Sequence, residues 1–176
     1  GQQRVMDTLT IIYFVYMFIS LYILSFFIVS FIRIRKELYE TPKITKEYGV
    51  SILIPAYNEE KAIEETIRAA SNLDYKNIKE IIVIDDGSTD NTLEIANSLK
   101  KDIPLLEIIH KKNGGKAEAL NLGIKKAKGE LIAIVDSDSF PRKNALQKTV
   151  GYFDNENVGV VTVPILVRNR HNLLSR

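Results

Sequence analysis

From Val50 onward, short apolar runs alternate with segments whose apolar residues recur at helical spacing. The runs with the length and composition of strands are Val50–Pro55, Lys79–Asp85, Leu105–His110, Leu131–Val135 and Val158–Val163. The segments expected to be helices are 59–70, 90–100, 116–127 and 143–153. Strands that alternate with helices form right-handed βαβ units with parallel strands. The sequence therefore predicts an α/β domain with a mostly parallel sheet and flanking helices.

The run Leu131–Val135 leads directly into Asp136-Ser137-Asp138, a D-x-D motif. Because the run is continuously apolar, we expect a strand buried on both faces near the centre of the sheet. Ligands of open α/β sheets bind at the carboxyl ends of the strands. Two carboxylates at that place suit a hard divalent cation such as Mg²⁺ or Mn²⁺. A polar turn is the alternative for these three residues taken alone.

Tyr57 and Asp86 lie in the loops that follow the first two predicted strands. Because the strands are expected to be parallel, these loops belong at the same edge of the sheet as the two carboxylates. The ring of Tyr57 offers a flat surface for a base, although a helix entry capped by Asn58 is an equally simple interpretation. Asp86 can accept a hydrogen bond from a ribose hydroxyl or a base N–H. A turn and a helix cap explain Gly87–Asp90 but leave Asp86 unexplained.

The loop after the third predicted strand contains Gly114, Gly115 and Lys116. A glycine pair before a helix presents free backbone N–H groups, and Lys116 adds a cation, so an anion could bind there. A flexible basic turn is the alternative for Lys111 and Lys112. The loop is not a Walker A motif, and no G-x-G-x-x-G follows the first strand, which argues against a dehydrogenase. Together, the four loops describe a site for a nucleoside diphosphate.

Composition excludes several other classes of protein. The net charge is +2, and basic residues alternate with acidic ones, whereas a nucleic-acid-binding surface needs clustered Lys and Arg. The chain has no Cys, which rules out disulfides, thiolate catalysis and Cys-ligated zinc. His110 and His171 lie far apart without metal-site spacing, so each is interpreted as a partly exposed structural residue.

An apolar segment precedes the α/β part of the chain. Leu9–Ile32 is an uncharged run of 24 residues. As a helix it would be about 36 Å long, enough to cross a hydrocarbon core of about 30 Å. Arg33, Arg35 and Lys36 follow it directly, and the positive-inside rule therefore places the following domain in the cytosol. We expect an N-terminal segment (1–8), a transmembrane helix (9–32) in the cell membrane and a juxtamembrane linker (33–49).

Four segments form a specific combination: Pro55-Ala56-Tyr57-Asn58-Glu59, Val83-Ile84-Asp85-Asp86-Gly87-Ser88-Thr89-Asp90, Asn113-Gly114-Gly115-Lys116-Ala117-Glu118-Ala119-Leu120-Asn121 and Val135-Asp136-Ser137-Asp138. The combination resembles the family-two inverting glycosyltransferases of the GT-A fold. The third segment most resembles the membrane-bound processive branch, which includes hyaluronan, chitin, cellulose and poly-N-acetylglucosamine synthases. Segments 167–170 and 172–176 are similar to the same branch, so the resemblance covers residues 50–176.

The resemblance implies a nucleotide-sugar donor, usually a UDP-sugar, and transfer to a growing polysaccharide. Tyr57 and Asp86 would hold the uridine, and Lys116 would lie near the nucleotide or its phosphates. Asp136 would face the ribose or the sugar and is a second candidate metal ligand, whereas Asp138 would coordinate Mg²⁺ or Mn²⁺ on the diphosphate. Two further residues, which would line the uridine end, are Pro55 and Glu59.

The sequence departs from the processive pattern because it has no Trp, and therefore no Gln-x-x-Arg-Trp motif, and no acidic residue after Glu156. The catalytic base is therefore unassigned and expected beyond Arg176. We expect residues 50–176 to be the donor-binding part of an incomplete glycosyltransferase domain. Two alternatives stay open: a transferase that adds one sugar to a polyprenyl phosphate, and a non-catalytic half that anchors or assembles a split synthase.

Overall fold

The computed structural model describes residues 2–39 and 41–163 and divides into two units, residues 1–41 and 42–176. The first unit holds a single helix, α1 (Gln2–Tyr39). Within it, Asp7–Arg35 is 29 residues long and apolar enough to cross a membrane. The predicted helix at 9–32 lies inside this segment. Length and composition are the evidence that it can span a bilayer.

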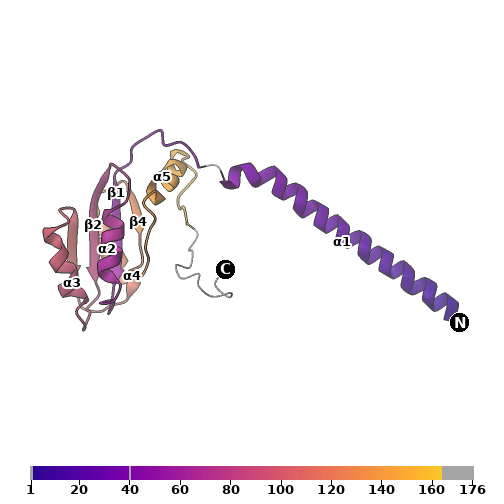
Figure 1. The fold of residues 1–176 in the computed structure, drawn as a ribbon, viewed down its shortest axis with the longest axis horizontal. Helices are drawn as coiled ribbons and strands as arrows, with labels where there is room; N and C mark the ends of the chain where they lie inside the picture. Colours follow the sequence, from indigo (N-terminus) through magenta and orange to yellow (C-terminus); the bar gives the residue numbers. More distant parts are fainter. Residues whose placement is uncertain (1, 40, 164–176) are drawn as a thin grey trace. The chain divides into compact units, whose positions relative to one another are not determined.

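The second unit is built on a four-stranded sheet in which all pairs of neighbours are parallel (Figure 1). The strands are β1 (Val50–Ala56), β2 (Ile78–Asp85), β3 (Leu106–His110) and β4 (Leu131–Ile134). Their order is β3-β2-β1-β4, so β1 is paired on both sides. The predicted parallel α/β sheet is confirmed.

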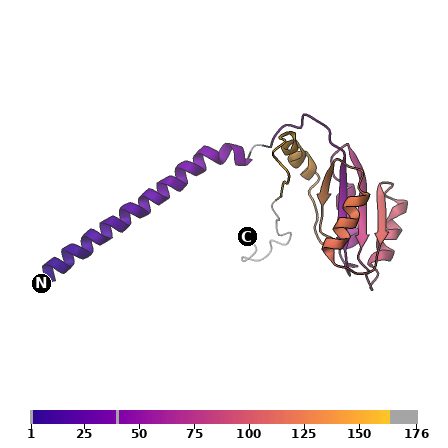
Figure 2. The same cartoon turned by 180° about the vertical axis from the view of Figure 1, so that it is seen from behind.

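Helices cover both faces of the sheet (Figures 1 and 2). The helical elements are α2 (Ile63–Ser71), α3 (Thr92–Ser98), η1 (Leu99–Lys101), α4 (Lys116–Lys126), α5 (Ala145–Thr149) and η2 (Val150–Asp154). Side chains of α2, α3 and α5 pack with one face of β1 and β2, and α4 packs with the other. Helix α4 approaches the sheet closely at Gly123, where a Cβ atom would lie 2.9 Å from Ile84 Cδ1.

The turn from α4 into β4 is held by a buried carboxylate. Glu80 in β2 is 2% exposed, and it accepts hydrogen bonds from Ser51 Oγ and from the Lys128 N–H, the latter at 2.7 Å. Lys128 Nζ lies 3.0 Å from the second carboxylate oxygen. Burial alone would raise the pKa of Glu80, but the hydrogen bonds from Ser51 and Lys128 outweigh it and lower that pKa. Glu80 therefore fixes where β4 begins.

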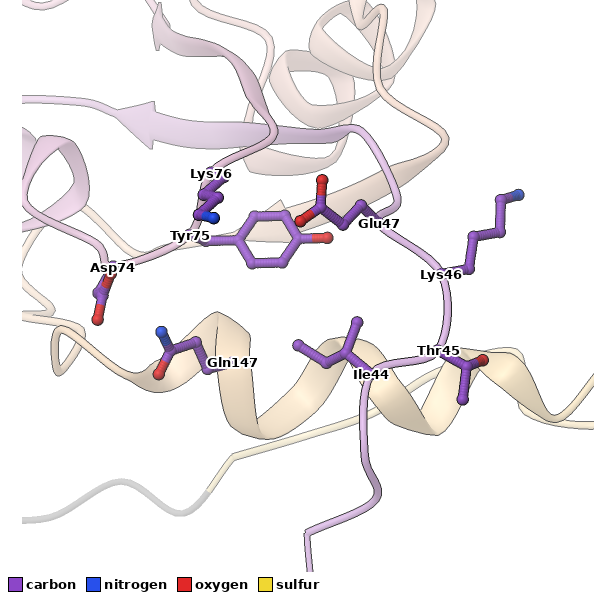
Figure 3. A pocket seen from close by; sticks show the side chains of 8 residues that line it. All are labelled: Ile44, Thr45, Lys46, Glu47, Asp74, Tyr75, Lys76 and Gln147. Carbon is purple, nitrogen blue, oxygen red and sulfur yellow. The ribbon is translucent and has the colours of Figure 1, made fainter.

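Residues 42–48, at the end of the predicted linker, pack against the domain. Thr45 donates its N–H and its hydroxyl to Asp154 Oδ2, at 3.0 and 2.7 Å. Tyr48 donates its hydroxyl to the Phe153 carbonyl, and Tyr75 donates to the Tyr48 carbonyl. A shallow hollow of about 250 Å³ lies beside this segment, between it, residues 74–76 and Gln147 of α5 (Figure 3). Because residues 42–49 lead into β1, the hollow lies near the amino ends of the strands.

Two expectations about the last strands are wrong. Residues 158–163 form no strand, and Val160 is 80% exposed, because no strand among residues 41–157 pairs with them. Strand β4 is also not central: it is one of the two edge strands of the described sheet. Ile132 and Ile134 are 36% and 51% exposed, because α4 packs over β1 and β2 and leaves this face of β4 uncovered.

Candidate functional site

Polar loops follow the carboxyl ends of all four parallel strands. Tyr57 follows β1, Asp86 follows β2 and Lys111 follows β3, while Asp136 comes two residues after β4. Because the four strands are parallel, these loops lie at one edge of the sheet, as predicted. Helix α4, which starts at Lys116, packs on β1 and β2 and connects β3 to β4.

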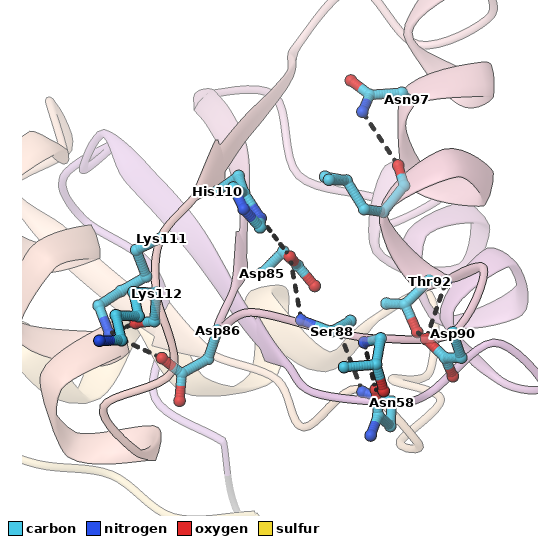
Figure 4. A network of polar contacts seen from close by, with 12 residues as sticks. Asn58, Asp85, Asp86, Ser88, Asp90, Thr92, Asn97, His110, Lys111 and Lys112 are labelled. Carbon is cyan, nitrogen blue, oxygen red and sulfur yellow. Dashed lines mark hydrogen bonds and ion pairs between the residues drawn. The ribbon is translucent and has the colours of Figure 1, made fainter.

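The loops after β1 and β2 are joined by hydrogen bonds through Asn58 (Figure 4). Its N–H donates to Ser88 Oγ at 3.0 Å, and its Oδ1 accepts from the Thr89 N–H at 2.8 Å. Asn58 has a φ of 54°, a left-handed conformation that Asn tolerates better than most residues. Asn58 therefore does not cap α2, which begins four residues later than predicted. Tyr57, beside it, is 48% exposed.

Pro55 and Glu59 flank Tyr57 and have backbone roles in the structure. Pro55 is buried within β1, where it is paired with Ile84 of β2. Glu59 is partly buried: its N–H donates to Thr92 Oγ1 at 2.8 Å, and its carbonyl accepts from the Ile63 N–H at the start of α2.

The carboxylate of Asp86 is the centre of the second loop. Asp86 is 4% exposed. Its Oδ1 accepts hydrogen bonds from Lys111 Nζ at 2.7 Å and from the Gly114 N–H at 2.9 Å, and its Oδ2 accepts from the Gly115 N–H at 2.7 Å. Burial alone would raise the pKa of Asp86, but these three hydrogen bonds outweigh it and the pKa is lowered. Asp86 is therefore an ionised residue that only accepts hydrogen bonds.

These contacts correct the interpretation of the glycine loop. The N–H groups of Gly114 and Gly115 are not free for an anion, because Asp86 already binds both. Lys111 is not part of a flexible turn either: its side chain is 12% exposed and lies between Asp86 and Glu118. Sequence reasoning overlooked the ion pair between Asp86 and Lys111. The sequence held one signal, because these oppositely charged residues directly follow two predicted strands. In the structure the two strands are neighbours, and Asp85 pairs with His110.

Asp85 and His110 form a second contact between β2 and β3. Asp85 is completely buried, and its Oδ2 lies 2.7 Å from His110 Nδ1, as Figure 4 shows. The side chain of His110 is 54% exposed, which agrees with its expected character as a partly exposed structural residue. Gly87 follows in a left-handed turn with φ of 73°, where a Cβ atom would lie 2.7 Å from the Asn113 nitrogen. The two loops are therefore in direct contact.

The two carboxylates after β4 have different surroundings. Lys116 Nζ lies 2.6 Å from Asp136 Oδ1, and the two side chains are 60% and 48% exposed. Asp138 is also exposed but has no hydrogen-bond or ion-pair partner among residues 2–39 and 41–163. Ser137 between them is buried, and its carbonyl accepts from Thr66 Oγ1 at 2.8 Å. The turn is fixed while both carboxylates stay at the surface.

This donor set fits a cation that shares its ligands with a phosphate. The described residues contain no group of three His, Cys, Asp or Glu side chains that could enclose a metal. Mg²⁺ is commonly bound by one or two carboxylates together with substrate phosphates and water, so a larger group is not needed. Asp138, exposed and unpaired in the described region, is the side chain best suited to this role.

The model of the family "Glycosyl transferase family 2" matches residues 51–176, which include all four loops. The chain belongs to glycosyltransferase family 2. Solved structures that are similar to it are GT-A glycosyltransferases, so the predicted GT-A fold is confirmed along with the family.

Curated relatives of this glycosyltransferase chain include two bacterial proteins. It is 33% identical over 147 residues to poly-beta-1,6-N-acetyl-D-glucosamine synthase of Staphylococcus aureus (strain COL). The aligned region covers 82% of this chain and 35% of that protein. It is 38% identical over 113 residues to glycosyltransferase GlyG of Streptococcus pneumoniae serotype 4, covering 64% of this chain and 37% of GlyG. The chain thus spans little more than a third of the length of these relatives.

Solved structures of two transferases are also similar to this chain. A mannosyltransferase of Pyrobaculum calidifontis in complex with GDP-Man and Mn²⁺ matches with a TM-score of 0.64 and 29% identity, over 75% of this chain and 41% of that one. Residues 1–349 of S. aureus TarS in complex with UDP-GlcNAc match with a TM-score of 0.56 and 29% identity, over 67% of this chain and 37% of that one.

Replacing Asp86 with asparagine is expected to destabilise the fold. Both carboxylate oxygens accept hydrogen bonds, so the amide NH₂ of asparagine would face the donor groups of Lys111 and Gly114 or that of Gly115 and could not accept from them. We expect the free energy of unfolding at pH 7 to fall by about 1.5–3 kcal/mol, measured by urea denaturation with circular dichroism. Since the folded-state pKa of Asp86 is lowered, its contribution is complete above the unfolded-state pKa of about 3.9 and disappears as the pH falls through the folded-state pKa. The parent should therefore lose more stability than the variant below about pH 4.

Asp138→Asn is the matched control, because Asp138 is exposed and unpaired among the described residues. Its free energy of unfolding should stay within about 0.5 kcal/mol of the parent value. An equal decrease in the free energy of unfolding in both variants would contradict the claim that the hydrogen bonds of Asp86 stabilise the fold.

Proposed function

We propose that the chain binds a nucleotide-sugar, preferably a UDP-sugar, together with Mg²⁺ or Mn²⁺, for inverting transfer of the sugar to a growing polysaccharide. The observation that carries this proposal is the placement of Tyr57, Asp86, Lys116 and the two carboxylates after β4 at one edge of a parallel sheet. Membership of family 2 supports the same reaction class.

The nucleoside would bind at the β1 and β2 ends of this edge. Tyr57 is half-exposed, so its ring is available for stacking, while Pro55, buried in β1, and the partly buried Glu59 would lie beneath and beside the nucleoside. Asp86 Oδ2 accepts one protein hydrogen bond and keeps a lone pair for a base N–H. Uracil offers such an N–H. The UDP-GlcNAc bound in the TarS structure supports a uridine nucleotide in a related fold.

The diphosphate would lie between α4 and the turn after β4. Lys116 at the start of α4 supplies a cation, and Asp138, with Asp136 as the second candidate, supplies carboxylate ligands for the metal. A bound divalent cation stabilises the negative charge that develops on the departing nucleoside diphosphate. The mannosyltransferase complex with Mn²⁺ supports a metal in a related fold.

The proposals for the acceptor and the cellular location are supported by the relatives and by α1. The staphylococcal relative is named as a synthase of a β-1,6-linked N-acetylglucosamine polymer, which supports a polysaccharide acceptor. Helix α1 would anchor the chain in the cell membrane, and Arg33 and Arg35 after the apolar run favour a cytosolic domain. The catalytic base stays unassigned.

The metal role of Asp138 can be tested by calorimetric titration of the full chain in detergent micelles with UDP. In the presence of Mn²⁺, Asp138→Ala should weaken UDP binding at least about tenfold, or about 1.4 kcal/mol. Without a divalent cation, the substitution should not weaken UDP binding, because it removes a negative charge near the diphosphate. Glu94→Ala, an exposed acid in the first turn of α3, is the control. UDP binding with Mn²⁺ that is equal in the parent and in Asp138→Ala would contradict the metal role.

The acceptor can be tested with membranes that contain the chain in its native context. A radiolabelled UDP-sugar should be incorporated into a long polymer that remains at the origin of a chromatogram and requires Asp138. A single labelled glycolipid would instead support transfer to a polyprenyl phosphate. Donor binding with no labelled product under any condition would support the non-catalytic anchoring half.

A further inference from the structure

Lys116 binds one of the two carboxylates that the proposed metal site needs. Its Nζ lies 2.6 Å from Asp136 Oδ1, a distance typical of a charge-assisted hydrogen bond. Asp138, two residues later, has no partner in the described region. In the proposed metal site, Asp138 is therefore free, whereas Asp136 is already paired with the ammonium group of Lys116.

The position of Lys116 is set by its neighbours. Lys116 is the first residue of α4, and Gly115 before it has a φ of 90°. The N–H of Gly115 is bound by the buried carboxylate of Asp86, so the start of α4 is fixed. The side chain of Lys116 is nevertheless 60% exposed and that of Asp136 is 48% exposed. Exposed ion pairs contribute little stability, so this pair can be exchanged for another partner.

A divalent cation and Lys116 would compete for the carboxylate of Asp136, whose Oδ1 the ammonium group already binds. A cation at Asp136 and Asp138 would lie close to the ammonium group, and like charges at that separation repel. A diphosphate offers Lys116 another anionic partner close by. Once Lys116 binds the diphosphate, Oδ1 of Asp136 is released and the ammonium charge no longer neutralises this carboxylate.

We propose that Lys116 exchanges between Asp136 and the diphosphate, and so keeps Asp136 from binding a divalent cation until a nucleotide is bound. This inference rests on the proposed function. It makes Lys116 a positioning residue with two partners, and it predicts opposite effects of one substitution on two ligands. Removal of the ammonium group opens Asp136 to the metal but deprives the diphosphate of a cation.

The test is calorimetric titration of the full chain with MnCl₂ alone and, separately, with UDP in the absence of divalent cations. In Lys116→Met, the affinity for Mn²⁺ alone should rise about fivefold or more, and the affinity for UDP alone should fall by a similar factor. Lys116→Arg retains the positive charge and should keep both affinities near the parent values. Loss of the electron paramagnetic resonance signal of free Mn²⁺ gives an independent measure of metal binding.

Lys112→Met is the matched control, because Lys112 is an exposed lysine in the loop that leads into α4, and its side chain has no partner among the described residues. It removes the same charge and should change Mn²⁺ affinity less than twofold. If Lys116→Met binds Mn²⁺ no more tightly than Lys112→Met, the exchange is overturned while the proposed function stands. If the parent binds no UDP even with Mn²⁺, both proposals are contradicted. Weaker binding of both ligands in Lys116→Met would show a purely structural lysine and would also overturn the exchange.

Discussion

The buried carboxylate of Asp86 holds together the loops at the carboxyl ends of the strands. It binds Lys111, Gly114 and Gly115 at once, and it thereby ties the end of β2 to the loop that leads into α4. The start of α4 then places Lys116 beside Asp136, after β4. At the opposite end of the sheet, Glu80 holds the turn from α4 into β4. Two buried carboxylates thus fix both ends of the crossover that brings the polar loops together.

Much of this arrangement could be predicted because it depends on local patterns. The alternation of apolar runs and helical segments was sufficient to predict a parallel sheet, and parallel strands necessarily bring Tyr57, Asp86 and Asp136 to one edge. The lack of Cys also rules out disulfides, thiolate catalysis and Cys-ligated zinc. The combination of four short motifs then indicated glycosyltransferase family 2, which the family model matches over residues 51–176.

The errors concern contacts between residues far apart in the sequence. Gly114 and Gly115 were interpreted as a free anion site, because nothing in their own loop reveals that Asp86, which precedes them by 28 and 29 residues, binds their N–H groups. Asn58 was considered as a helix cap, whereas its bonds to Ser88 and Thr89 hold it in a left-handed conformation. The apolar run in β4 suggested a central strand, but burial depends on what covers it, and the described part of the chain leaves one face open.

The central claim is that Asp138 holds a divalent cation on the diphosphate of a nucleotide bound at this edge. The most direct measurement is a crystal structure of the chain with UDP and MnCl₂, in which anomalous scattering locates the manganese. The account predicts a manganese ion about 2 Å from an Asp138 carboxylate oxygen, in contact with the diphosphate, and uracil stacked on Tyr57. UDP bound elsewhere, or manganese absent from Asp138 while the diphosphate lies at this edge, would contradict it.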